Sequence, residues 1–165
     1  MNDKILQTND DKKALEDLLN SMLGSFEEKM PFNKVLGIRI EALTLEEVRL
    51  RFDMREELIG NFVHRILHGG VISAVLDVAG GMISIANALF QRRDELSDSE
   101  RLQGIDKSGT IDLRIDYLRP GRGKYFIATG QVLRSGRKVA VTRMELHNDE
   151  GVLIAVGTGS YLVGQ

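Results

Sequence analysis

The sequence predicts an α+β domain in which six antiparallel β-strands curl around one long, buried helix. Three observations favour this architecture: an almost uninterrupted apolar segment from residue 70 to about residue 91, two strand-like runs before it, and four after it. A helix that is apolar on nearly all sides must be covered on nearly all sides, and a curled sheet is the simplest cover. A flat sheet with both predicted helices on one face is the alternative.

The strand-like runs alternate apolar and polar residues with the period of two that is typical of half-buried strands. They are residues 37–44, 47–54, 110–118, 124–134, 138–148 and 152–163. In the third run the apolar positions begin at Ile111 and end at Tyr117, which predicts that these side chains share one face. Pro120-Gly121 and Ser135-Gly136 are turn signals between the later runs, so we expect antiparallel hairpins.

The first 30 residues form a separate element in this prediction. Apolar side chains recur at helical spacing across residues 11–29, which predicts an amphipathic helix that ends at Met30-Pro31. We therefore divide the chain into an N-terminal tail and helix (residues 1–30) and one main domain (residues 31–165). The N-terminus lacks the apolar core of a signal peptide, which favours a cytoplasmic protein.

Composition excludes several classes of function. The chain has 165 residues, of which 42% are apolar and 28% charged, with a net charge of −2, so neither nucleic acid nor an anionic membrane is an expected partner. It has no cysteine, and its three histidines show no metal-ligand spacing, so we expect no metal site. The apolar segment is the only candidate for a membrane span, but Asp77 and four glycines interrupt it.

A polar stripe runs along the predicted buried helix. At 100° per residue one face carries Ser73, Asp77, Gly80, Ser84, Asn87 and Gln91. A carboxylate among apolar side chains loses hydration, so its position indicates either a functional group or a structural hydrogen bond. On residue type alone both interpretations stay open.

Two glycines, Gly69 and Gly70, stand at the start of this helix. Helix N-termini present free N–H groups that favour negative charge, which is how an oxyanion hole stabilises a tetrahedral intermediate; a simple tight turn is the alternative. Gly70 and Asp77 are seven residues apart, or roughly 10 Å along a helix. One reacting carbon cannot contact both, so a shared role predicts two antiparallel copies of the helix in a symmetric homodimer.

The segment LHGGVISAVLDVAGG resembles the HGG-x6-D signature of the hotdog-fold acyl-CoA thioesterases, in the phenylacetyl-CoA thioesterase-like branch of the 4-hydroxybenzoyl-CoA thioesterase superfamily. The segments MPFNKVLGIRI, GTIDLRIDYLRPGRGK, VLRSGRKVAV and NDEGVLIAVGTGSYLV are similar to other parts of that family. Together they extend the resemblance over residues 30–163.

The resemblance implies a hotdog fold, homodimers and often dimers of dimers, and hydrolysis of an acyl-CoA thioester to acid and CoA without a metal or other cofactor. In this family the position of Asp77 is occupied by the acid that acts as general base or nucleophile. Gly70 matches the amide of the oxyanion hole, and His68 matches the residue beside the substrate carbonyl. The sequence leaves the choice between base and nucleophile open.

Two further catalytic candidates come from the resemblance. Thr110 matches the polar residue that helps to position water near the carboxylate of the same chain. Asn61 resembles the asparagine ahead of the HGG motif, although the loop NFVHRILH is one residue longer than usual. His64 lies inside this loop and is the alternative to Asn61.

CoA carries phosphates, so arginines and lysines at strand ends are candidates to bind it, ordinary surface charge being the alternative. The expected substrate-binding residues are Gly69, Arg119, Gly136, Arg137 and Lys138, and Arg122 is a further cation at a turn. The apolar helix favours a medium or long acyl chain over an aryl group. Two other functions stay open, a non-catalytic acyl-CoA-binding module and a hydratase or dehydratase of the same fold.

Overall fold

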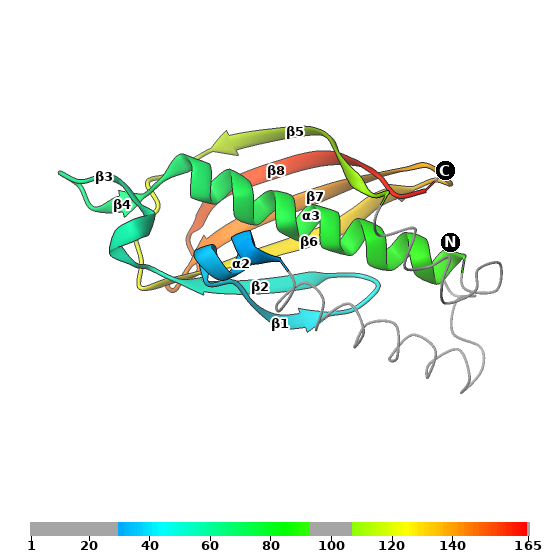
Figure 1. The fold of residues 1–165 in the computed structure, drawn as a ribbon. Helices are drawn as coiled ribbons and strands as arrows, with labels where there is room; N and C mark the ends of the chain where they lie inside the picture. Colours follow the sequence, from blue (N-terminus) through cyan, green and yellow to red (C-terminus); the bar gives the residue numbers. More distant parts are fainter. Residues whose placement is uncertain (1–29, 93–106, 165) are drawn as a thin grey trace.

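The computed structural model describes residues 30–92 and 107–164. The predicted helix at 11–29, the division at residue 30 and most of the charged connector lie outside these residues. One long helix, α3 (Gly69–Gln91), lies against a six-stranded sheet that bends around it, with β1 and β2 along one side and β8 and β5 along the other (Figure 1). This is the hotdog arrangement that the sequence predicts, and the sheet is curled, not flat.

All six predicted strands are confirmed, with ends displaced by at most two residues. They are β1 (Arg39–Leu43), β2 (Val48–Asp53), β5 (Gly109–Tyr117), β6 (Tyr125–Ser135), β7 (Val139–Asn148) and β8 (Leu153–Leu162). Their order is β1-β2-β6-β7-β8-β5, and every neighbouring pair is antiparallel. β1 and β5 are therefore the two edge strands of the sheet.

The core lies between α3 and the inner face of the sheet. On β2 the alternating residues Val48, Leu50 and Phe52 are completely buried, and Phe52 stacks on Phe126 of β6 with ring centroids 5.3 Å apart. α3 contributes residues such as Leu76, which is also completely buried. Each such side chain stabilises the fold by about 1.5–3 kcal/mol relative to exposure, which fixes the helix on the sheet.

α3 has the length and hydropathy of a membrane span, but over half of its most apolar window is buried inside this domain. It is therefore the core helix of the fold. Its buried residues include Met82, Ile83, Leu89 and Phe90, which pack in the interior.

Four short elements were not predicted. They are α2 (Pro31–Leu36), a 3-10 turn η1 (Glu56–Leu58), and the hairpin strands β3 (Ile59–Asn61) and β4 (Ile66–Leu67). Met30 is extended, as the residue before proline should be, but Pro31 begins a helix of its own. The periodicity missed these elements because each is too short to show a repeat.

A β-bulge changes the predicted alternation of β5. Thr110 pairs with Tyr161 and Asp112 with the next β8 residue, Ser160, so Ile111 is the extra residue on β5. Ile111 is consequently 57% exposed and does not share the inner face predicted for it. Because the bulge shifts the side-chain phase by one residue, Thr110 can face α3.

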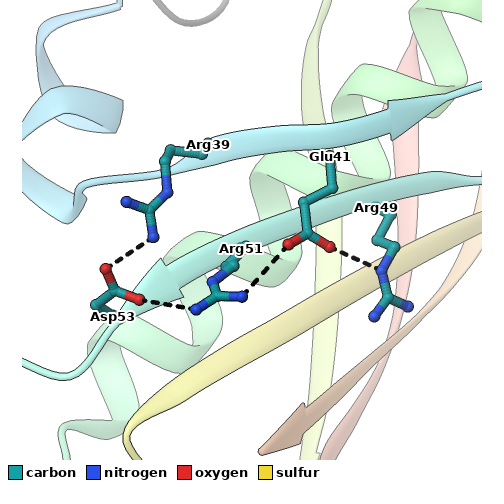
Figure 2. Close-up of polar contacts among 5 residues, drawn as sticks. All are labelled: Arg39, Glu41, Arg49, Arg51 and Asp53. Atoms are coloured by element: carbon teal, nitrogen blue, oxygen red, sulfur yellow. Dashed lines mark hydrogen bonds and ion pairs between the residues drawn. The ribbon is translucent and has the colours of Figure 1, made fainter. Parts of the chain in front are cut away.

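The outer face of the sheet carries a ladder of ion pairs, shown in Figure 2. Asp53 lies 2.7 Å from Arg39 and 3.6 Å from Arg51, and Glu41 lies 2.9 Å from Arg49 and 3.8 Å from Arg51. Each of these two carboxylates is thus shared between two arginines. Paired, partly exposed charges of this kind keep an outer sheet face soluble and contribute little stability individually.

Candidate active site

His68 caps the N-terminus of α3. Its backbone is extended, its Nδ1 accepts the Gly70 N–H at 2.8 Å, and its carbonyl oxygen accepts the N–H groups of Val71 and Ile72. The Nδ1 thus offers its lone pair to the first turn of the helix. The histidine thereby does what serine or aspartate does at most helix starts.

The two glycines of the motif are therefore in different situations. The Gly70 N–H is occupied by His68, whereas the Gly69 N–H has no acceptor among the residues that the structure describes. The first N–H groups of a helix lack intrahelical partners, and the positive end of the helix dipole lies there. The Gly69 N–H is a vacant donor for an anionic oxygen.

Asp77 and Thr110, which the family resemblance implies to lie near each other, are in direct contact. The Thr110 hydroxyl donates a hydrogen bond to Asp77 Oδ1 at 2.9 Å, from the bulged start of β5 to the third turn of α3. Asp77 is half-buried, and within the described part of the chain it forms no ion pair. One carboxylate oxygen is thus fixed by a neutral donor, and no cation of the described residues neutralises the carboxylate.

Tyr161 of β8 supports Asp77 from the interior, a contact that the sequence did not indicate. Its hydroxyl donates to the Asp77 carbonyl oxygen at 3.3 Å, and the side chain is almost completely buried. Burial, and next the charge of Asp77, raise the pKa of this phenol well above its usual value, so it stays a neutral donor. A Cβ at Gly80 would collide with the Tyr161 ring, which explains a glycine there.

Only part of the predicted polar stripe of α3 is accessible to solvent. Ser73, Asp77 and Asn87 are half-buried, but Ser84 is completely buried and its hydroxyl donates to the Gly80 carbonyl oxygen at 2.7 Å. Gly80 and Ser84 therefore face the interior and cannot meet solvent or substrate. Helical spacing gave the correct face, but not how far β8 covers it.

Asn61 and His64 lie on the β3–β4 hairpin, which extends beyond the N-terminal end of α3 (Figure 1). Asn61 Oδ1 accepts the N–H groups of Val63 and His64 at 3.1 and 3.0 Å and so closes the turn. Arg122 donates to the His64 carbonyl oxygen at 3.0 Å and ties the hairpin to the β5–β6 loop. Neither side chain contacts Asp77 within this chain.

The predicted CoA-binding residues fall into two groups at opposite ends of α3. Arg119 follows β5 near the start of the helix and donates to the Leu153 carbonyl oxygen at 2.9 Å. The 136–138 turn joins β6 to β7 beside the end of the chain, where the Lys138 carbonyl oxygen accepts the Val163 N–H at 2.9 Å. A helix of 23 residues spans roughly 34 Å, so one ligand cannot contact both groups of one chain.

A metal site finds no support in the described ranges, where no three histidine, aspartate or glutamate side chains form a group that could hold an ion. The site itself offers a carboxylate, a hydroxyl and the N–H groups of a helix start.

Comparison with known proteins gives a consistent result. The model of the thioesterase superfamily matches residues 64–155. The medium/long-chain acyl-CoA thioesterase YigI of Escherichia coli K12 is 48% identical over 135 residues, covering 82% of this chain and 86% of YigI. Two solved structures have folds similar to that of this chain.

The first structure is a Shewanella oneidensis protein related to the thioesterase superfamily. It has a TM-score of 0.87 and 44% identity, covering 92% of this chain and 98% of that one. The second is the E. coli PaaI protein from the phenylacetic acid degradation operon, with a TM-score of 0.73 and 20% identity over 92% of this chain and 96% of PaaI. The second likeness concerns the fold alone.

Proposed function

The chain belongs to the thioesterase superfamily, and from that premise we propose that it is an acyl-CoA thioesterase, which hydrolyses an acyl-CoA thioester to free acid and CoA. The observation that carries the proposal is the Asp77 carboxylate, held by the Thr110 hydroxyl at 2.9 Å and free of any described cation. CoA is part of the substrate, and the proposed chemistry uses no cofactor.

Asp77 acts in one of two ways. As a general base it removes a proton from water, whose oxygen attacks the thioester carbon; the C–S bond then breaks and the thiolate of CoA takes up a proton. As a nucleophile its free oxygen attacks the same carbon and expels CoA thiolate, and water then hydrolyses the mixed anhydride. In both cases the Thr110 hydroxyl keeps the carboxylate oriented.

The start of α3 stabilises the negative charge that develops on the thioester oxygen. The Gly69 N–H is the donor that is vacant as the structure stands. The Gly70 N–H, matched to the oxyanion amide by the family motif, becomes a second donor only when the His68 ring releases it. Donors that are already oriented stabilise an oxyanion without reorganisation.

The complete site is formed by two chains in this proposal. Gly69 and Asp77 are eight residues apart, or roughly 12 Å along the helix, which is too far for one carbonyl group to contact both. A homodimer with antiparallel α3 helices brings Gly69 of one chain near Asp77 of the other. The exposed edge strand β5, which carries Thr110, is available for such pairing, and a dimer of such dimers would keep the same site.

CoA phosphates are bound by cations from both chains. Arg119 lies at the Gly69 end of its own helix. In an antiparallel pair, the C-terminal end of the other chain's α3 lies beside the N-terminal end of this α3. The other chain's Gly136, Arg137 and Lys138 therefore come to the end of the helix at which Arg119 lies. In this arrangement one CoA molecule can contact both groups of predicted binding residues, which lie at opposite ends of α3 within one chain.

We further propose a medium- or long-chain acyl group and a cytoplasmic location. The support for chain length is the similarity to YigI, which is a medium/long-chain acyl-CoA thioesterase. The apolar residues of α3 that favoured it in the sequence do not, because Met82 and Phe90 are buried in the core.

The test is release of free CoA from a panel of acyl-CoA thioesters of increasing chain length, with one aryl thioester included. We expect hydrolysis with a preference for medium and long aliphatic chains. Binding of the thioesters without CoA release would contradict the proposal and favour a non-catalytic binding module. Preference for the aryl substrate would leave the reaction intact and overturn the chain-length proposal.

A further inference from the structure

The peptide group between Gly69 and Gly70 is held at both of its polar atoms. Its carbonyl oxygen accepts hydrogen bonds from the hydroxyls of Ser73 at 3.0 Å and Tyr117 at 3.1 Å. Its N–H donates to His68 Nδ1 at 2.8 Å. Two consecutive glycines at a helix start would otherwise be the most mobile part of the helix.

Tyr117 contributes more than one contact. A Cβ built on Gly69 would lie 3.5 Å from Tyr117 Cε1, so the tyrosine ring covers one side of Gly69. The Tyr117 and Ser73 hydroxyls also lie within hydrogen-bond distance of each other, so their two protons are shared between this contact and the Gly69 carbonyl oxygen. Two hydroxyls, the His68 ring and the tyrosine ring thus converge on the first turn of α3.

Core packing does not explain the Tyr117 hydroxyl. The side chain is 53% exposed and stands at the end of the edge strand β5, where a phenylalanine would cover Gly69 equally well. β5 also supplies Thr110, whose hydroxyl fixes Asp77. One strand therefore supports both halves of the site, the carboxylate at its start and the helix N-terminus at its end.

We propose that Tyr117 is a positioning residue that, together with Ser73, holds the Gly69–Gly70 peptide in one orientation and thereby restricts rotation about the Gly69 backbone, which keeps the vacant N–H of the adjoining His68–Gly69 peptide in a fixed direction before substrate binds. This inference rests on the proposed thioesterase function. The hydroxyl does not touch the substrate. It removes motion of the glycine pair that would otherwise have to be arrested in the transition state.

The direct test is Tyr117→Phe, which keeps the ring and deletes the hydroxyl. We expect kcat for acyl-CoA hydrolysis to fall about tenfold, with KM changed less than about twofold, because the lost hydrogen bond acts on the transition state. Ser73→Ala should lower kcat as well, and the double variant should lose less than the product of the two effects, since both hydroxyls hold one carbonyl. Amide hydrogen exchange at Gly70 should become faster in Tyr117→Phe.

The matched control is Tyr125→Phe. The Tyr125 ring lies under the Arg51 guanidinium, 3.7 Å from its carbon, on the outer face of the sheet, which is the face turned away from α3. The control variant should leave kcat, KM and the Gly70 exchange rate unchanged.

Unchanged kcat in Tyr117→Phe would overturn the inference, as would a rise in KM alone or a loss of kcat explained by a lower Tm than the control shows. The thioesterase proposal fails separately, if the wild-type protein releases no CoA. A wild type that is active and depends on Asp77, with Tyr117→Phe fully active, would overturn only the role of Tyr117.

Discussion

The carboxylates on the outer face of the sheet and the carboxylate on α3 have opposite surroundings. On the outer face Asp53 and Glu41 are each shared between two arginines, as Figure 2 shows. On the inner side Asp77 is held by the hydroxyl of Thr110 and by no cation among the described residues. The molecule therefore pairs the acids on the outer face of its sheet with arginines and leaves the Asp77 carboxylate without a cation among the described residues.

This difference shows how a protein can keep a carboxylate able to act as a base or a nucleophile. An arginine beside a carboxylate occupies its lone pairs and offsets its negative charge, which makes it a weaker base and a weaker nucleophile. A hydroxyl donor fixes one oxygen, adds no charge and leaves the other oxygen exposed to water or substrate. Such a placement costs stability, so it is retained where function requires it.

The largest expected effect is the loss of activity on substitution of Asp77. Asp77→Asn keeps the shape and the hydrogen bond from Thr110 but removes the base or nucleophile, so kcat for CoA release should fall by about 10²- to 10⁴-fold. Asp53→Asn on the outer ladder is the matched control. It should change kcat less than about twofold and the free energy of unfolding by at most about 1 kcal/mol. Equal losses in the two variants would show that the faces do not differ as described.

The second prediction separates the buried side of α3 from its open side. Leu76 is completely buried beside Asp77, and Leu76→Ala should lower the free energy of unfolding by about 2–5 kcal/mol in a urea titration. Ser73→Ala, on the open side, should lower it by less than about 1 kcal/mol. Similar values for the two variants would contradict the burial pattern.

The third prediction concerns the Thr110 hydroxyl, which donates a hydrogen bond to Asp77. Thr110→Val keeps the β-branched shape and deletes the hydroxyl, so kcat should fall by roughly 10- to 100-fold, the range for losing a hydrogen bond to a charged group. Thr110→Ser keeps the hydroxyl and should retain most of the activity. If Thr110→Val were as active as Thr110→Ser, the hydroxyl would have no role in orienting Asp77.

The smallest effect concerns pH and Tyr161. Because folding raises the pKa of this buried phenol, the native state holds its proton more tightly than the unfolded chain, whose phenol has a pKa of 10.0. The resulting stability is fully present below that pH and is lost as the pH rises above it. Between about pH 9 and pH 11 the wild type should lose about 1 kcal/mol more unfolding free energy than Tyr161→Phe. Parallel pH curves would contradict this assignment.

The repeating elements of the fold could be predicted from the sequence because each buries one face. The alternation in residues 47–54 and the apolar run of α3 indicate directly which of their residues are buried. The β3–β4 hairpin and α2 could not be predicted, since they are too short for a period. The bulge at Ile111 was also missed, because one extra residue in β5 leaves no pattern in the sequence of that strand alone.

The site was predicted in part. The spacing of Gly70 and Asp77 and the family motif indicated the helix start and the carboxylate, and the Thr110–Asp77 contact followed from the resemblance. The different states of the Gly69 and Gly70 N–H groups depend on which way the His68 ring turns, which no spacing encodes. The contacts of Tyr161 and Tyr117 join segments over 40 residues apart and required the folded structure.

The most direct test of the central claim, a site built from Asp77 of one chain and the Gly69 amide of another, uses Asp77→Asn and Gly69→Pro chains. Proline at the first helical position deletes the Gly69 N–H with little strain, because His68 before it is already extended. Gly69→Ala, which keeps the N–H and meets Tyr117 at an ordinary 3.5 Å, is the control and should stay active.

The two chains are co-expressed with different affinity tags, and the heterodimer is purified through both. Each parent homodimer should be nearly inactive. The heterodimer retains one site with both an intact Asp77 and an intact Gly69 amide, so its kcat should recover to about half of the wild-type value per dimer. A purified heterodimer as inactive as its parents would contradict a site shared between two chains.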